Sequence, residues 1–310
     1  MVLLKDIQGQ NNAIRYLSGS LSSGKRASSY LFFGPEGVGR ALTAKAFLAA
    51  VMCGEKPGSG DACGQCSVCG RINELNHPDV MWISPGKNKK IKIDEVRKIK
   101  DVLNLKPYEG AVNACVIEDA HMMTVEGANA LLKVLEEPPE RSILILISSK
   151  KELLLPTVVS RCTEVRFNSL PVETAKDIIM RHSDVDEGEA RFLAHFSEGA
   201  PGRALEIIND GILQRKQDLI EMLKKTAGEK DASSLLWDED KKDALLEDLE
   251  LLIVFFRDIA LEKPEMSDLF EKYPVGKISG IVERLIGLRQ ALLGNVNPKL
   301  VAQVLPGILR

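Results

Sequence analysis

The segment from Gly34 to Ala41 has the glycines of a phosphate-binding loop but lacks two of its functional side chains. In the pattern G-x-x-x-x-G-K-[ST], the glycines let backbone N–H groups surround a phosphate at a helix N-terminus. The lysine reaches the β- and γ-phosphates, and the hydroxyl binds Mg²⁺. Here the glycines are Gly34, Gly37 and Gly39, whereas Arg40 and Ala41 replace the lysine and the hydroxyl residue. The pattern predicts a nucleotide-binding scaffold that does not hydrolyse nucleotide.

The two replacements remove different parts of the chemistry. The guanidinium of Arg40 is planar and larger than an ammonium, so it does not fit the same compact site between phosphates. Ala41 has no oxygen, so one metal ligand is absent. The context is that of a phosphate loop, because an apolar strand at 30–33 precedes it and a helical pattern at 41–52 follows it. The alternative is a glycine-rich strand-to-helix turn that binds no nucleotide.

Two carboxylates, Glu118 and Asp119, follow an apolar, β-rich run at 111–117. In phosphate-loop ATPases the usual order at this position is Asp then Glu, where the first acts on Mg²⁺ and the second orients the attacking water. The inverted order moves each carboxylate by about a methylene, and reactions of this kind are sensitive to displacements of about 1 Å. We therefore expect a second weakening of hydrolysis. The alternative is a solvated strand end.

Four of the six cysteines lie close together in the sequence, at Cys53, Cys63, Cys66 and Cys69. The C-x2-C-x2-C run brings three thiolates to one side of a turn, and Cys53 supplies a fourth across a loop rich in Gly, Pro and Ser. Four thiolates complete a tetrahedral zinc site and leave no open position. The spacing therefore predicts a structural Zn²⁺ within an insertion at 53–69.

Other interpretations of the cysteines stay open. Bacterial ferredoxins share C-x2-C-x2-C but continue with x3-C-P, where this chain has Asn73 and Glu74. A metal-free cysteine cluster, or His77 in place of one cysteine, are further alternatives. The remaining cysteines, Cys115 in an apolar strand and Cys162 after a turn, are expected to be buried and unreactive.

Composition narrows the class of protein. The chain has 310 residues, enough for two or three domains, with 45% hydrophobic and 27% charged residues. A formal net charge of -3 argues against tight nucleic-acid binding by the chain alone. The N-terminal residues 1–6 lack a signal-peptide pattern, and no apolar run approaches the roughly 18 residues of a membrane span. We expect a cytoplasmic protein without membrane contact, in which cysteines are thiols or metal ligands.

A lysine cluster at Lys87, Lys89 and Lys90 could contact a DNA backbone or form a solvated hairpin tip. Upstream of it, 77–83 reads as a strand entered through a proline turn. Downstream, Asp94 is expected to cap a helix that runs to Asn104.

The remaining elements define the fold class. An amphipathic helix at 129–137 ends at two prolines, and 143–147 reads as a central strand. Strands alternating with helices, with a phosphate loop on the first strand, predict an α/β domain with a parallel doubly wound sheet. Short helices follow at 171–208. Four or five longer helices, broken at Lys263-Pro264, Tyr273-Pro274 and Asn297-Pro298, complete the chain.

These motifs together resemble one protein family. The altered phosphate loop, the cysteine run, the Ile-Glu-Asp-Ala strand end, the segment NALLKVLEEPP at 129–139 and the segment PTVVSRC at 156–162 are similar to bacterial AAA+ clamp-loader subunits of DNA polymerase III. The similarity extends over the whole chain. The changes at Arg40, Ala41 and the swapped acids resemble the delta-prime group of that family more than the gamma group.

The resemblance implies an assignment of domains. Residues 1–168 correspond to the AAA+ domain with its zinc insertion, 169–208 to a small helical lid, and 209–310 to an all-helical collar used in oligomerisation. In the lid, Arg203 matches the sensor 2 position, and Ser148 and Ser149 lie near sensor 1. Without hydrolysis in this subunit, these residues are expected to be vestigial.

The resemblance also implies a function. Such a subunit stands in a pentameric ring beside a gamma or tau ATPase, with delta on the other side of a gap, and the ring loads a sliding clamp onto primed DNA. The arginine of SRC, here Arg161, would project into the neighbour's ATP site and neutralise charge on the transferred phosphoryl group. Its plain alternative is a surface ion pair. Two rival functions are an active gamma-like ATPase with a variant loop and a zinc-dependent nucleic-acid module.

Overall fold

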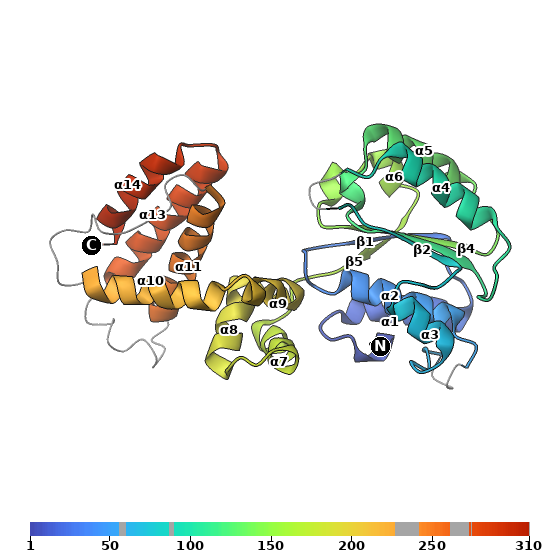
Figure 1. Cartoon of the computed structure of the whole chain (residues 1–310), viewed down its shortest axis with the longest axis horizontal. Coiled ribbons are helices and arrows are strands. Elements are labelled where there is room, and N and C mark those ends of the chain that lie inside the picture. Colours follow the sequence, from blue (N-terminus) through green and yellow to red (C-terminus); the bar gives the residue numbers. More distant parts are fainter. Residues whose placement is uncertain (56–59, 87–89, 227–241, 261–272, 274, 310) are drawn as a thin grey trace. The chain divides into compact units, whose positions relative to one another are not determined.

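The computed structural model describes residues 1–55, 60–86, 90–226, 242–260, 273 and 275–309 (Figure 1). The chain divides into two compact units. The first consists of Met1–Ile178 and Glu198–Arg203, and the second of Ile179–Ser197 and Ala204–Arg310. The three-part division at 168 and 208 stays a prediction.

The first unit is built on a five-stranded parallel sheet. Its strands are β1 (Ser29–Phe33), β2 (Val80–Ile83), β3 (Asn113–Ile117), β4 (Ser142–Ser148) and β5 (Thr163–Arg166). Their order is β2-β3-β4-β1-β5, and every neighbouring pair is parallel. The predicted parallel α/β sheet is confirmed, with β4 at its centre.

Helices cover both faces of this sheet (Figure 1). On one face lie α1 (Asn11–Ser23), α2 (Arg40–Met52) and α3 (Ser67–Asn73), and on the other lie α4 (Ile93–Asn104), α5 (Val125–Glu136) and α6 (Pro156–Val159). Short 3₁₀ turns, η1 (Leu4–Asp6), η2 (Ala120–Met122) and η3 (Lys151–Leu153), join these elements. Since both faces are covered, β3 and β4 are buried along their whole length, as their continuous apolar sequences predict.

Side chains from the sheet and its helices form the core of the first unit. Val96 and Ile99 of α4 and Leu131 of α5 pack in one apolar cluster with residues of β3 and β4. On the α2 side, the rings of Tyr30 and Phe47 meet edge to face with centroids 5.3 Å apart. This packing fixes the strand ends, where the chemically interesting side chains lie.

Two helix starts differ from the sequence-based expectation. The residue that caps α4 is Lys92, and Asp94 lies in the first turn instead, where its negative charge favours the helix N-terminus. Helix α5 begins at Val125, earlier than predicted, because the Thr124 hydroxyl accepts a hydrogen bond from the Gly127 N–H.

The second unit is helical in its described residues. It contains α8 (Glu187–Phe196), α10 (Ile212–Thr226), α11 (Lys242–Ala260), α13 (Val275–Leu293) and α14 (Pro298–Ile308). The domain boundary falls within α7 (Val172–His182) and α9 (Pro201–Asn209). Asn297 caps α14 as the Asn-Pro break predicts, whereas Lys263-Pro264 and Pro274 lie outside the described residues. No described helix has the length and apolarity that a membrane crossing requires.

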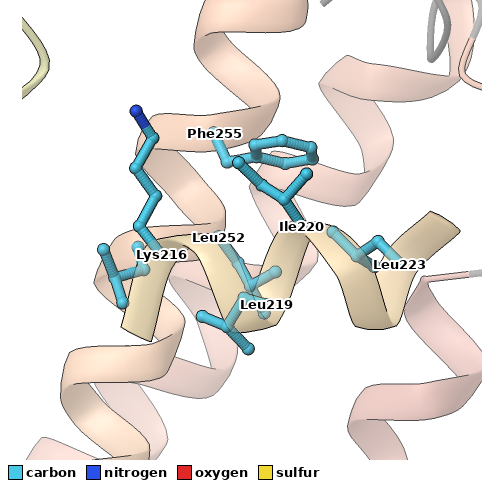
Figure 2. Close-up of a pocket in the computed structure, with 7 residues that line it drawn as sticks. Lys216, Leu219, Ile220, Leu223, Leu252 and Phe255 are labelled. Atoms are coloured by element: carbon cyan, nitrogen blue, oxygen red, sulfur yellow. The ribbon is translucent and has the colours of Figure 1, made fainter. Parts of the chain in front are cut away.

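The contact between α10 and α11 is a closely packed apolar seam. Leu219 and Leu223 of α10 face Leu252 and Phe255 of α11, and the space left between them is about 10 Å³ (Figure 2). That volume holds about one water molecule, so this seam is packing and not a ligand site.

Candidate functional site

The phosphate loop connects β1 to α2 in a conformation that only glycine permits at two points. Gly34 and Gly37 have φ values of 145° and 75°. A Cβ on Gly34 would lie 2.1 Å from the carbonyl oxygen of Phe167, and one on Gly37 would lie 2.4 Å from the backbone nitrogen of Arg203. The glycines therefore let the loop pack closely against two other segments of the first unit.

Arg40 is the first residue of α2, and its side chain is directed inward. The residue is only 6% exposed, and its Nη1 has no hydrogen-bond partner among the described residues. Burial lowers the pKa of Arg40, while the nearby charges of Asp119, Glu36 and Glu118 favour its charged form. The loop thus keeps a buried cation with a spare donor, and Ala41 beside it offers no oxygen for a metal ion.

The carboxylate of Glu118 is held by two neighbours from the β2 end of the sheet. Trp82 Nε1 donates a hydrogen bond of 3.1 Å to Glu118 Oε2, and Ser84 Oγ donates one of 2.7 Å to the same oxygen. Asp119 follows in a left-handed conformation, with φ of 47°. The acid that would come first in the metal-binding order is therefore already engaged within the chain.

Ser148, at the end of β4, is fully buried, and its hydroxyl lies 3.2 Å from His121 Nδ1. Burial lowers the pKa of His121. Ser148 Oγ also accepts a hydrogen bond of 3.1 Å from the Lys150 N–H. These contacts use the Ser148 hydroxyl to shape the strand end, while Ser149 beside it is half-buried.

The backbone of Arg203, the predicted sensor residue, lies next to the phosphate loop. The Gly202 N–H donates a hydrogen bond of 2.8 Å to the Gly37 carbonyl oxygen. Sequence reasoning missed Gln10, which is 3% exposed and ties the same region together. Its Nε2 donates to the carbonyl oxygens of Val38 at 3.3 Å and Asn168 at 2.7 Å. No local sequence signal marks Gln10, because the partners of its side chain, Val38 and Asn168, are distant along the chain.

Arg161 lies just after α6, and its side chain is 36% exposed. Its Nη1 donates to the Thr157 carbonyl oxygen at 3.0 Å and lies 3.5 Å from Ser160 Oγ. Its Nη2 lies 2.8 Å from Oε1 of Glu136, the last residue of α5. The guanidinium is thus accessible at the surface and already has an anionic partner within the chain.

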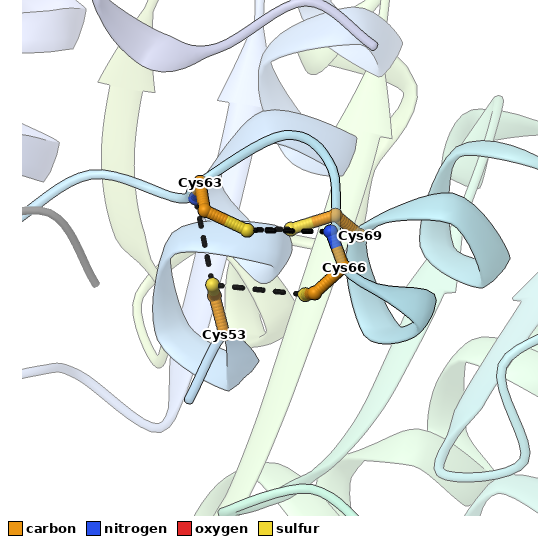
Figure 3. A group of neighbouring side chains, drawn as sticks. All are labelled: Cys53, Cys63, Cys66 and Cys69. Carbon is orange, nitrogen blue, oxygen red and sulfur yellow. Dashed lines mark hydrogen bonds between the residues drawn. The ribbon is translucent and has the colours of Figure 1, made fainter. Parts of the chain in front are cut away.

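The four predicted cysteine ligands converge (Figure 3). The Sγ atoms of Cys53 and Cys66 are 3.9 Å apart, as are those of Cys63 and Cys69, and all four lie within 4.8 Å of one another. Four sulfurs at the Zn–S distance of about 2.3 Å define a tetrahedron with edges of about 3.8 Å. The cluster therefore has the size of a single-ion site. A four-iron cluster, in which each thiolate binds a different iron, needs wider spacing.

Backbone N–H groups donate hydrogen bonds to two sulfurs of the cluster, which favours the thiolate form that binds a metal ion. The Cys63 N–H donates to Cys53 Sγ at 3.4 Å, and the Cys66 N–H donates to Cys63 Sγ at 3.3 Å. N–H groups of Gln65 and Cys66 lower the pKa of Cys63 to about 7. Burial raises the pKa of Cys53 and of Cys69, and a bound metal ion would offset that cost by its charge.

The other candidate ligands and cysteines lie apart from this group. His77 is buried and its Nδ1 accepts a hydrogen bond from the Asp79 N–H, and it is not part of the metal-capable group. Cys115 is fully buried, and burial raises its pKa. Cys162 is only partly buried, a difference from the expectation, and burial raises its pKa to about 12. Lys90 is exposed, and the other two lysines of the predicted cluster lie outside the described residues.

Comparison with known proteins gives a consistent set of relatives. The family described as "DNA polymerase III, delta subunit" matches residues 9–171. DNA polymerase III subunit tau of Bacillus subtilis (strain 168) is 29% identical over 300 residues, which are 87% of this chain and 52% of that protein. DNA polymerase III subunit delta' of Pseudomonas aeruginosa (strain PAO1) is 31% identical over 214 residues, or 68% of this chain and 65% of that protein. The chain thus spans about half to two thirds of these relatives.

Among solved structures, a DNA polymerase III gamma subunit-related protein of Thermotoga maritima is 19% identical, with a TM-score of 0.48. The match covers 95% of this chain and 98% of that one.

Proposed function

The chain belongs to the family described as DNA polymerase III, delta subunit, which matches residues 9–171 of its 310, and we propose that it is a delta-prime type, non-hydrolysing subunit of the bacterial replicative clamp loader. The proposal includes the partners of such a subunit: gamma or tau ATPases and delta, together with the sliding clamp and primed DNA. The delta' relative of Pseudomonas aeruginosa supports this choice within the family.

The proposal that this chain does not hydrolyse ATP rests on one observation, the two replaced side chains of the phosphate loop at the start of α2. Arg40 stands where a lysine would contact phosphate, and Ala41 supplies no metal ligand. The two hydrogen bonds that Glu118 accepts from Trp82 and Ser84 add to this, since that carboxylate would have to leave both donors to bind Mg²⁺. A bound nucleotide would therefore lack the metal geometry that phosphoryl transfer requires.

The active contribution of the subunit is then its arginine. Arg161 presents an accessible guanidinium at the boundary between α6 and β5. In a ring, this position would let Arg161 act in trans on the nucleotide of the adjacent ATPase subunit. Arginines of this kind accelerate phosphoryl transfer by about 10³ to 10⁵ in GTPases, because they neutralise charge that develops in the transition state.

The cysteine cluster completes the proposal as a structural zinc site. The sulfur spacing supports a single tetrahedral ion held by Cys53, Cys63, Cys66 and Cys69. The ion would tie the end of α2 to the start of α3 and leave no position for a substrate. The AAA+ domain at 1–168 and the collar at 209–310 are proposed as the parts that contact neighbouring subunits.

One alternative function has its own support. The tau relative of Bacillus subtilis aligns with 87% of this chain, so a gamma-like ATPase with a variant loop is the second candidate. Turnover of ATP by the purified chain decides between them. If the chain is a non-hydrolysing subunit, its ATP turnover should not exceed that of a control variant in which Gly37 and Gly39 are both replaced by alanine.

The arginine role is tested in the reconstituted clamp-loader complex. Arg161→Ala should leave assembly intact in gel filtration and abolish the share of DNA-stimulated ATP turnover that comes from the adjacent site. Arg166→Ala, an exposed arginine on β5, serves as the control and should leave turnover unchanged. Unchanged turnover in the Arg161→Ala complex would remove the trans role.

A further inference from the structure

The two sides of the Arg161 guanidinium are held by different partners. On one side, Nη1 is bound by the Thr157 carbonyl oxygen and lies near Ser160 Oγ, both on α6 or its cap. On the other side, Nη2 is 2.8 Å from the Glu136 carboxylate, which belongs to α5. The backbone contact fixes the direction of the side chain, whereas the carboxylate neutralises its charge.

The nitrogen that Glu136 occupies is the one that phosphate recognition needs. A guanidinium binds an oxyanion with two parallel N–H groups, from Nη1 and Nη2 or from Nε and Nη2. Nη2 belongs to both of these edges. Nη2 carries two N–H groups, one on each edge. A phosphoryl oxygen on the second N–H would lie next to the Glu136 oxygen, and these like charges repel each other.

We propose that Glu136 is a positioning residue for Arg161, and that its carboxylate is the counter-ion which the arginine must release before it can act on a neighbouring nucleotide. This inference rests on the proposed trans role of Arg161. In the separate chain, Glu136 keeps the guanidinium neutralised against α6. In the assembled ring, the phosphates of the adjacent site compete with Glu136 for Nη2.

The contact is weak enough to be exchanged. The Arg161 and Glu136 side chains are 36% and 51% exposed, so solvent screens their attraction. The orientation of Arg161 does not depend on Glu136 alone, because Thr157 is on the opposite side of the guanidinium. Removal of the negative charge should therefore free the arginine without losing its direction.

This reasoning predicts a gain of function. Glu136→Gln keeps the size of the side chain and an amide oxygen acceptor, and removes the charge. ATP turnover of the complex at limiting ATP should rise about 1.5- to 5-fold, the range that an exposed ion pair corresponds to. The gain should shrink at high salt, because ions screen the same pair in the unchanged protein.

The test is a double-mutant cycle in the reconstituted complex with ATP as the probe. Glu136→Gln, Arg161→Ala and the double variant are compared, with Glu137→Gln as the matched control. Glu137 is the adjacent exposed carboxylate and forms no ion pair among the described residues. Thermal unfolding and gel filtration of each variant verify that folding and assembly are unchanged.

The expected result is a rise with Glu136→Gln that is absent from the Arg161→Ala background and absent with Glu137→Gln. Turnover that stays equal or falls with Glu136→Gln, while Arg161→Ala remains defective, overturns this inference and leaves the proposed function intact. A rise that persists without Arg161 also overturns it, since Glu136 would then act elsewhere. If Arg161→Ala itself has no effect, the proposed function fails and takes the inference with it.

Discussion

Replacement of Cys66 by serine tests the metal site most directly. The Cys66 Sγ is 3.9 Å from that of Cys53, close to the edge of about 3.8 Å expected for a zinc tetrahedron. Serine has nearly the same shape but is a much poorer ligand. In small modules, structural zinc binds with an apparent free energy of about 10 to 16 kcal/mol. Divided among four thiolates, this is roughly 3 kcal/mol for each. The zinc Kd should therefore rise about 100-fold.

The same change has a calculable effect on stability. Zinc at about 1,000 times its Kd stabilises the folded state by about 4 kcal/mol, and at about 10 times its Kd by about 1.4 kcal/mol. For a unit of this size, 1 kcal/mol shifts the unfolding temperature by about 2 to 4 °C. Chelation should thus lower the midpoint of the unchanged protein by about 8 to 16 °C, and that of the Cys66→Ser variant by only about 3 to 6 °C under the same zinc concentration.

The assay combines plasma emission analysis of bound metal with thermal unfolding, with and without a chelator. Cys162→Ser is the control, because Cys162 lies outside the cluster and should leave one equivalent of zinc bound. Purified protein without stoichiometric metal, with a midpoint that chelators do not change, would refute the zinc assignment. Visible absorption above about 400 nm with bound iron would indicate an iron–sulfur cluster instead.

Two further predictions concern the phosphate loop and a buried carboxylate. The double substitution Arg40→Lys with Ala41→Thr should leave ATP turnover of the purified chain undetectable, because Glu118 still accepts its two hydrogen bonds from Trp82 and Ser84. Turnover at the rate of an active loader would contradict this. Burial raises the pKa of Asp79, but hydrogen bonds from the N–H groups of residues 108–110 lower it by more. The pKa of Asp79 is therefore lower than its ordinary value. Asp79→Asn should therefore destabilise the first unit at pH 7. Urea unfolding should show this difference shrinking as pH falls below about 4, where the carboxylate of the unfolded chain binds a proton before that of the folded chain does. A difference independent of pH would be evidence against it.

The sequence by itself was sufficient where chemistry depends on residues close together in the chain. The loop glycines, the replacements at Arg40 and Ala41 and the cysteine run could be interpreted directly, because backbone permissiveness and ligand type are properties of local sequence. The parallel sheet also followed, since apolar runs that alternate with amphipathic helices have few other ways to bury their surfaces.

What only the tertiary structure decided are the contacts between distant segments. Gln10 and Trp82 belong to no motif, and Glu136 lies in the NALLKVLEEPP segment, which does not reveal its ion-pair partner. The partners of all three are in other elements, so no local pattern could have identified these contacts. The N-cap positions at Lys92 and Thr124 were likewise decided by the tertiary structure, because more than one nearby residue could have capped each helix. The physical reason is the same in each case: local sequence sets which groups a residue offers, but packing of the whole unit sets which of those groups meet and which remain available for a partner.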